Sequence, residues 1–478
     1  MRFSGRFGRS SVQAAPGRLA GTAAGVLAAA TLMLALGSPA GTAATTAAPT
    51  VFPGCSWPIE TTPTKANVAA PDSYATYWTT PFLAGPGDSV VIKGSFPTSR
   101  FMSFVVYNDS FQDFTNNVGG HSVPSDLSDY RIRPDRGSGN PWRTSKAGKR
   151  QKFTVRILPV VTAAQQRSEN AIPMIDQDAP ADPQGPPGLG YVIFRTYIPS
   201  GGNTTVRLPA MTVTHDGRTV TLPQCTPAAS AGNAASPGSG ISPGSPASCA
   251  SGCGDPTLHY FGPSAAAQAG LFPNPVNGYL EMNFTPERGY VVVTHGKAPS
   301  SPVDAGSGMP GDSIGAHPVP WLHPRFQVRY WSVANYLAAK PYPIVKVGRG
   351  ANAIFGGTAD YVTTLKNGYY TVVSSLPSDK PSPASLKANA ATWIPTSPRK
   401  SAALEFQLLR NMLSQQSLYP EGFVFIKPPA NSADIIPPAR VQKQMGAYYP
   451  QAAQCTVQVF QAQGWTGCLA ASAAAAGR

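Results

Sequence analysis

The chain has 478 residues, of which 13% are charged and 42% are hydrophobic, and its formal net charge is +14. This composition excludes a disordered polyelectrolyte, because the apolar fraction is large enough to build a core. The densest basic group, residues 146–150, is short, so we expect no nucleic-acid partner. With 47 Gly and 50 Pro, breaks are too frequent for long helices, which favours strands and loops.

The first 44 residues have the layout of a secretory signal peptide. Four arginines and no acidic residue precede the apolar run 25–36, which is too short for a normal bilayer span, and small residues precede Ala40. No Arg-Arg pair occurs, so residues 1–44 predict a Sec-type signal peptide and a secreted product without a stable membrane span. The remaining 33 Lys and Arg against 23 Asp and Glu give +10, which is compatible with an anionic or polysaccharide envelope polymer as partner; the alternative is charge scattered over a large surface, which serves solubility.

The mature chain divides at a segment that cannot form a core. Residues 226–256 are almost all Ala, Gly, Ser and Pro, and predict a flexible linker. Residues 45–225 and 257–468 are both of normal domain size, and each carries short β-branched and aromatic runs that predict strands. The alanine-rich end, 469–478, is predicted to be a disordered tail.

Two helices are expected among the strands of the second part. Residues 401–417 are rich in Leu, Ala and Gln and lack Gly and Pro, which predicts a helix. A short helix is also expected after Pro438.

Five sequence features recur in the same order in both parts. They match 87–94 with 288–296, the word Arg-aromatic-x-Ser-x-x-x-Tyr at 100–107 with the same word at 329–336, Asp129 with Asp360, Phe153 with Tyr370, and Arg195 with Arg410. Five matches in one order favour a diverged tandem duplication, and the period far exceeds that of solenoid repeats, so each copy should be a whole domain. The predicted fold is mainly β, with two tandem β-sandwich or jelly-roll-like domains, a few short helices and a flexible linker.

A resemblance to known proteins rests on five words of the sequence. The words are ATYW (75–78), RFMSFVVYN (100–108), RPDRGSGNPW (133–142), RYWSVANY (329–336) and NGYYTVV (367–373). They resemble an uncharacterised family of secreted proteins from high-GC bacteria. Each half is also similar to the jelly-roll-like domain of unknown function in bacterial envelope proteins. The resemblance implies a β-rich fold and an extracytoplasmic address, and it implies no catalytic residues.

The six cysteines form an even set in a chain that we expect to be exported, which predicts disulfides. They are Cys55, Cys225, Cys249, Cys253, Cys455 and Cys468. Sequence alone allows several connectivities; proximity and bracketing favour Cys55 with Cys225, Cys249 with Cys253, and Cys455 with Cys468. A zinc site is not expected, because three residues separate Cys249 from Cys253 and no second pair completes a ligand set.

Four arginines lie inside apolar runs, where an unpaired buried charge is costly. They are Arg100, Arg195, Arg329 and Arg410, and the recurring Asp129 and Asp360 are candidate partners. We predict buried arginine–carboxylate pairs that pin strands. The alternative is a guanidinium presented to a carboxylate or phosphate ligand.

No residue is predicted to be catalytic. The word GDSIG, 311–315, matches G-x-S-x-G, but Ser313 lies in a loop and lacks the strand-to-helix context and a distant histidine. Asp176, Asp178 and Asp182 lie together in a Pro-rich loop, where carboxylates are usually solvated. No metal site and no cofactor are predicted.

Two tryptophans in Gly/Pro-rich loops, Trp142 and Trp321, are predicted to be exposed and to contact a ligand, since sugars stack on aromatic rings. The sequence therefore favours a non-enzymatic secreted protein that binds an envelope or extracellular polymer through its tandem β-domains. The alternative is a secreted hydrolase or carbohydrate-active enzyme with a site in the inserted loops, where paired carboxylates could cleave glycosides.

Overall fold

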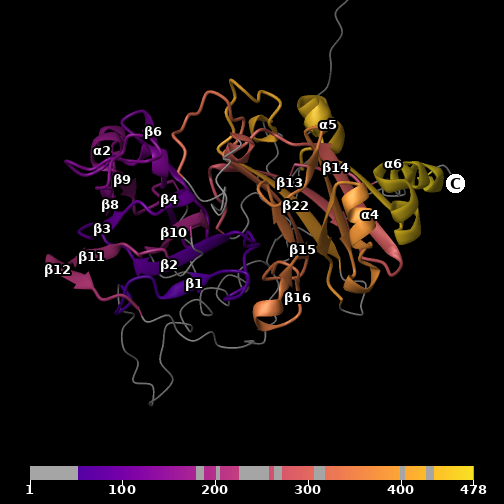
Figure 1. The fold of residues 1–478 in the computed structure, drawn as a ribbon. Coiled ribbons are helices and arrows are strands. Elements are labelled where there is room, and N and C mark those ends of the chain that lie inside the picture. The colour runs from indigo at the N-terminus through magenta and orange to yellow at the C-terminus, as the bar shows by residue number, and fades with distance from the viewer. Residues whose placement is uncertain are drawn as a thin grey trace, which may run out of the picture.

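The computed structural model describes residues 52–178, 188–200, 205–225, 258–262, 272–305, 318–398, 404–426 and 435–476. Within these residues the protein is mainly β. Its mostly antiparallel sheets form two pairs that lie side by side (Figure 1). The predicted signal peptide and the predicted linker lie outside the described residues.

The first sheet pair lies between residues 59 and 222. One sheet has the strand order β1-β2-β10-β4-β7, and the other has the order β12-β11-β3-β8-β9. The strands are β1 (Ile59–Thr61), β2 (Ala75–Leu83), β3 (Ser89–Ser95), β4 (Ser99–Tyr107), β7 (Asp126–Ser128), β8 (Lys152–Leu158), β9 (Ala171–Pro173), β10 (Leu189–Pro199), β11 (Ala210–His215) and β12 (Arg218–Leu222). The hairpin β5 (Thr115–Val118) with β6 (His121–Pro124), the turn η1 (Asp129–Arg131) and α2 (Ala163–Glu169) complete this part.

The second sheet pair lies between residues 277 and 456. One sheet has the order β13-β22-β15-β18, and the other has the order β19-β20-β14-β23, with β21 beside β20. The strands are β13 (Asn277–Phe284), β14 (Tyr290–Lys297), β15 (Tyr330–Leu337), β18 (Gly357–Ala359), β19 (Leu365–Lys366), β20 (Tyr369–Ser375), β21 (Ala391–Pro395), β22 (Glu405–Met412) and β23 (Gln451–Thr456).

Short elements and three helices surround the second pair. They are η3 (Pro302–Ala305), the hairpin β16 (Lys346–Val347) with β17 (Ile354–Phe355), η4 (Gly350–Asn352), η5 (Pro377–Asp379), α4 (Pro383–Ala388), η6 (Phe423–Phe425), α5 (Pro438–Met445), η7 (Gly446–Tyr448) and α6 (Val457–Ala476). The helix α6 lies on the side of the second pair that faces away from the first pair (Figure 1).

The strands of the two pairs follow matching orders. Eight strands of the first pair have a counterpart at the same place in the second pair. In one sheet β2, β10, β4 and β7 correspond to β13, β22, β15 and β18. In the other sheet β11, β3, β8 and β9 correspond to β23, β14, β20 and β21. A parallel neighbour follows a short helix in each, with β9 beside β8 after α2 and β21 beside β20 after α4. The registers also agree, since Ser103 lies opposite Arg195 and Ser332 lies opposite Arg410.

Apolar side chains fill the space between the sheets of each pair. In the first pair, Trp78, Phe104 and Phe194 meet residues of the opposite sheet such as Ile92 and Val155. In the second pair, Leu280, Val333 and Leu409 have the same role. A third cluster, which includes Phe101, Tyr197, Tyr330 and Met412, joins the two pairs. Every residue of β4 and of β22 is therefore buried, because each strand is covered on both faces.

Two sequence predictions are wrong, and one helix is confirmed. Within the helix predicted at 401–417, residues Glu405–Met412 form the strand β22, because pairing with β13 and β15 and complete burial override the helix propensity of Leu and Gln. The tail predicted to be disordered from residue 469 continues α6 to Ala476. The short helix expected after Pro438 is α5.

Two disulfides join described residues, Cys55–Cys225 and Cys455–Cys468. Cys249 and Cys253 lie outside the described residues. Disulfides persist in oxidising compartments, which is where these two bridges place the chain. Among the described helices, none combines the length and the apolar character that crossing a membrane requires.

Candidate functional site

Two reciprocal ion pairs connect the sheet pairs. Arg100 of β4 places its Nη1 2.9 Å from Asp360 Oδ2, and Arg329, directly before β15, places its Nη1 2.5 Å from Asp129 Oδ1. All four side chains are 0% exposed. The partners are the residues that the sequence indicated, but each arginine meets the aspartate of the other half. Removing water from four charges is costly, and this close pairing offsets part of that cost.

Each aspartate of these pairs follows a short strand. Asp129 begins η1 after β7, and its carboxylate also accepts hydrogen bonds from the backbone N–H groups of Met102 and Tyr130 at 3.0 and 2.6 Å. Burial raises the pKa of Asp129, and Arg329 and the backbone donors oppose that rise. Asp360 follows β18, and burial likewise raises its pKa against the opposing effect of Arg100.

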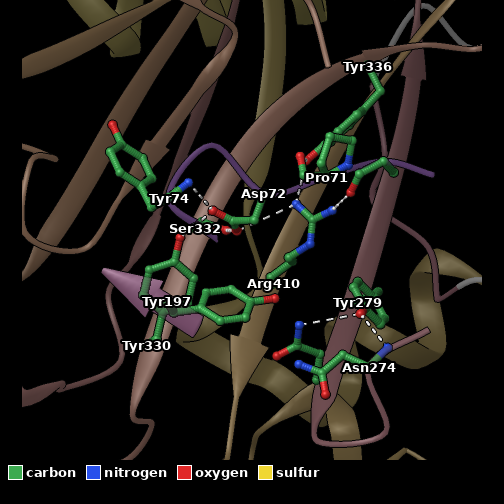
Figure 2. Close-up of polar contacts among 12 residues, drawn as sticks. Pro71, Asp72, Tyr74, Tyr197, Asn274, Tyr279, Tyr330, Ser332, Tyr336 and Arg410 are labelled. Carbon is green, nitrogen blue, oxygen red and sulfur yellow. Dashed lines mark hydrogen bonds and ion pairs between the residues drawn. The ribbon is translucent and has the colours of Figure 1, made fainter. Parts of the chain in front are cut away.

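A second polar cluster surrounds Asp72, which precedes β2 but lies against the second sheet pair. Figure 2 shows its carboxylate between Ser332 and Arg410. The Tyr330 hydroxyl donates to Oδ1 at 2.8 Å, the Ser332 hydroxyl donates to Oδ2 at 2.7 Å, and Arg410 Nη1 lies 3.8 Å from Oδ2. These four residues are between 0% and 4% exposed.

The segment 70–72 covers the arginine of the second pair. Arg410 donates from Nη1 to the Tyr336 hydroxyl at 2.6 Å and from Nη2 to the Ala70 carbonyl at 2.7 Å. The Tyr336 hydroxyl in turn donates to the Pro71 carbonyl at 3.0 Å (Figure 2). A chain segment of the first half thus closes over a buried cation of the second.

The converse contact occurs on the first sheet pair. Arg195 donates from Nη2 to the Tyr107 hydroxyl, which donates to the Pro273 carbonyl at 2.7 Å. Phe272 packs edge-on against Tyr107 and Tyr191. The segment 272–274, which precedes β13, therefore covers Arg195 as 70–72 covers Arg410. Both clusters are buried, and their hydrogen bonds join residues of the two halves.

The two tryptophans predicted to be exposed are buried, so that prediction is wrong. Trp142 is 0% exposed and donates from Nε1 to the Arg100 carbonyl at 3.2 Å. Trp321 is 7% exposed, and the Arg329 guanidinium lies 4.8 Å from its ring centroid. The Trp321 ring therefore covers the guanidinium of one reciprocal pair, and the Trp142 ring is part of the core of the first sheet pair.

A row of rings on the outer face of the second pair was missed by sequence reasoning. The His295 ring of β14 is stacked with Tyr369 of β20 at 5.3 Å and with Trp465 of α6 at 5.2 Å, centroid to centroid. Tyr369 is 37% exposed, and His295 and Trp465 are half-buried. Lys297 of β14 lies opposite Tyr369 in the sheet and is half-buried, and its Nζ lies 4.7 Å from the centroid of the Tyr448 ring. The signal was weak, because the three rings are far apart in the sequence.

The ring row places one titratable group against aromatic neighbours. Burial lowers the pKa of His295, and its Nδ1 lies 3.0 Å from the Thr371 hydroxyl. A neutral imidazole between two rings favours flat apolar stacking over charge pairing. We call His295, Tyr369 and Trp465 the ring row.

Of the loop residues considered for catalysis, the structure describes Asp176 and Asp178. Ser313 and Asp182 lie outside the described residues. Asp176 accepts a hydrogen bond from Asn108 Nδ2 at 2.9 Å, and Asp178 is exposed. Across the part of the chain that the structure describes, His, Cys, Asp and Glu side chains form no group of three that could hold a metal.

Comparisons with known proteins give structural likeness alone. No protein-family model matches the chain, and no curated protein matches it. An uncharacterised protein from Burkholderia cenocepacia is similar at a TM-score of 0.43 and 10% identity, over 84% of this chain and 82% of that one. The VPA0106 protein from Vibrio parahaemolyticus is similar at a TM-score of 0.34 and 9% identity, over 73% of this chain and 87% of that one.

Proposed function

We propose that this protein is a secreted, non-enzymatic binding protein, built from two tandem β-sandwich domains, that holds an envelope or extracellular polysaccharide on the ring row. The predicted signal peptide and the two disulfides support an extracytoplasmic location. The net charge of +10 after signal removal suits a polymer that carries some negative charge.

The matching strand orders support duplication of one ancestral sandwich. Ser103 and Ser332 face Arg195 and Arg410 in the same register, so the residues shared by the copies belong to the scaffold. Their buried positions against the other half explain why both copies kept them. Specific contacts with a ligand then belong to features that one copy alone has.

The ring row is such a feature, and it is the observation on which the proposal rests. The strands β14 and β20 correspond to β3 and β8 of the first pair. His295 lies opposite Thr371 in the second pair, and at the same place in the first pair Lys93 lies opposite Thr154. The first pair therefore has a lysine where the ring row has its histidine. Sugar rings stack on partly exposed aromatic faces because their C–H surfaces are apolar. Lys297 adds a cation that can pair with an acidic sugar.

Sedimentation with insoluble cell wall, chitin and cellulose tests the proposal. We expect the protein to be retained on at least one polymer and the variant Tyr369→Ala, Trp465→Ala to lose most of that retention. The matched control is Phe355→Ala on β17, which removes a half-buried ring with a lysine, Lys346, 5.8 Å from its centroid. Absence of retention on every polymer, or equal retention by the double variant, contradicts the proposal.

A further inference from the structure

The surroundings of the two covered arginines, Arg410 and Arg195, differ in charge. Arg410 has a carboxylate, Asp72, at 3.8 Å. In the corresponding segment of the chain Asn274 takes the place of Asp72, and the local hydrogen bonds agree. Asp72 N donates to the Tyr77 hydroxyl and Asn274 N donates to the Tyr279 hydroxyl, each at 3.2 Å. By this correspondence, the segment that covers Arg195 carries a neutral amide where the segment that covers Arg410 carries an acid.

No carboxylate among the described residues lies within ion-pairing distance of Arg195, which is 1% exposed. Asp113 and Asp126 are the acids near enough to act on it through space. Asp126 pairs with Arg131 at 3.4 Å, and burial raises the pKa of Asp113 to about 6. Burying a guanidinium without a counter-charge is unfavourable, because the charge loses its hydration and gains no ion pair.

Three buried donors near this position have no hydrogen-bond partner in the described part of the chain. They are Arg195 Nε, Ser103 Oγ and Asn274 Nδ2. Ser103 and Asn274 are 1% and 4% exposed. In the other cluster the group that corresponds to Ser103, the Ser332 hydroxyl, donates to Asp72 Oδ2 at 2.7 Å. Phe101 also takes the place of Tyr330, so the hydroxyl that donates to Asp72 Oδ1 has no counterpart here.

We propose that a small monovalent anion, for which chloride is the probe, binds beside Arg195, Ser103 and Asn274 and supplies the negative charge that the Asp72 carboxylate supplies in the other half. The three donors supply hydrogen bonds, and the guanidinium supplies the opposite charge. A water molecule satisfies donors but leaves the charge of Arg195 uncompensated, which is why an anion fits this position better.

Thermal unfolding of the full chain tests the anion site, in sodium chloride and in sodium gluconate at matched ionic strength. Matched ionic strength makes the general screening of charges equal in the two salts. Gluconate is too large for a buried position, so specific binding is possible in chloride alone. We expect Tm to be higher in chloride and to rise with chloride to a plateau, as ligand linkage requires. Equal Tm values in the two salts at every concentration would overturn the proposal.

The variant Asn274→Asp separates this site from other chloride effects. It supplies the missing carboxylate, so we expect its Tm to be the same in both salts. Asn352→Asp makes the same charge change at an exposed position and should keep the chloride effect. A chloride effect that persists in Asn274→Asp would refute the assignment.

Crystals of the wild-type protein grown with bromide give an answer that does not depend on the variant folding. We expect an anomalous peak within hydrogen-bond distance of Arg195 Nε and Ser103 Oγ. Density there without an anomalous signal, or peaks only at the surface, would show water at this position and exclude the anion.

Discussion

Arg329 and Asp129 form an ion pair whose side chains are both fully buried, so substitution of either residue should lower the free energy of unfolding strongly. We expect Arg329→Met to lower the free energy of unfolding by about 3–5 kcal/mol, since it leaves Asp129 buried without its partner. Adding Asp129→Asn to this variant should recover much of the loss, because it removes the unpaired charge and its single amide oxygen can still accept from one of the two N–H groups, that of Met102 or that of Tyr130. Urea unfolding measures all three proteins.

An exposed ion pair provides the comparison for that prediction. Lys65 and Glu60 are 2.9 Å apart, with 42% and 18% of their side chains exposed. Lys65→Met should change the free energy of unfolding by at most about 1 kcal/mol. If Arg329→Met were as mild as Lys65→Met, or if the double variant were less stable than Arg329→Met, burial would not be what makes the reciprocal pairs matter.

A second prediction at this scale concerns pH. Glu405 begins β22 and is 0% exposed, and burial raises its pKa to about 8 while the Ser397 N–H opposes the rise. Between the ordinary glutamate pKa and this value the folded chain holds a proton that the unfolded chain has released. This group therefore makes the protein less stable as pH rises through that window.

The variant Glu405→Gln removes this titration and keeps an acceptor for Ser397 N, which donates to Glu405 Oε1 at 2.6 Å. We expect the wild-type protein to lose stability relative to this variant from pH 5 to pH 8, with a slope of at most about 1.4 kcal/mol per pH unit. Urea unfolding at several pH values gives the difference. A difference that is constant over the window would show that Glu405 does not titrate there.

At the scale of elements, the two described disulfides close loops of very different length. Cys55 and Cys225 are 170 residues apart, and Cys455 and Cys468 are 13 apart. In the chain-entropy model the first bridge stabilises by about 5 kcal/mol and the second by about 3 kcal/mol. The first joins the strand-poor start of the described chain to the end of β12, and the second ties α6 to β23.

We therefore expect Cys55→Ser, Cys225→Ser to lower the free energy of unfolding more than Cys455→Ser, Cys468→Ser does. Urea unfolding of both double variants measures the two losses. Local strain in either bridge changes the absolute losses, so the ranking is the quantity to compare. An equal or reversed ranking would mean that loop length does not decide the contribution of these bridges.

For the whole molecule, the contacts between the sheet pairs predict cooperative unfolding. A shared apolar cluster, two reciprocal ion pairs and two covering segments join the halves. Unfolding of one half alone would expose the buried rings and unpaired charges of the other. We expect a single calorimetric transition whose measured enthalpy equals the van't Hoff enthalpy.

The double variant Arg100→Met, Arg329→Met weakens this connection from both sides. We expect its heat-capacity curve to broaden or split, because each half then loses a buried contact that depends on the other. Lys65→Met again serves as the control with a single transition. Two separate transitions in the wild-type protein would show that the halves are thermally independent.

Local patterns in the sequence determined much of the fold. Short apolar runs between Gly and Pro breaks predicted a mainly β chain, and the recurring Arg-aromatic-x-Ser word marked two strands, β4 and β15, that hold matching positions. Such patterns are readable because strand formation and side-chain alternation depend on neighbours close in the sequence. The same reasoning singled out Arg100, Arg329, Asp129 and Asp360 as buried charges.

The partners of these residues follow from the way the sheets pack against each other. Each arginine reaches the aspartate of the other half, and the segments 70–72 and 272–274 each cover an arginine of the opposite half. Trp142 and Trp321 are buried. All of these contacts depend on how the two sheet pairs pack together. Residues 401–417 have the composition of a helix, yet Glu405–Met412 within them form a central strand, because two neighbouring strands offer hydrogen bonds. Contacts between distant segments carry no local signature, so composition and spacing could not reveal them.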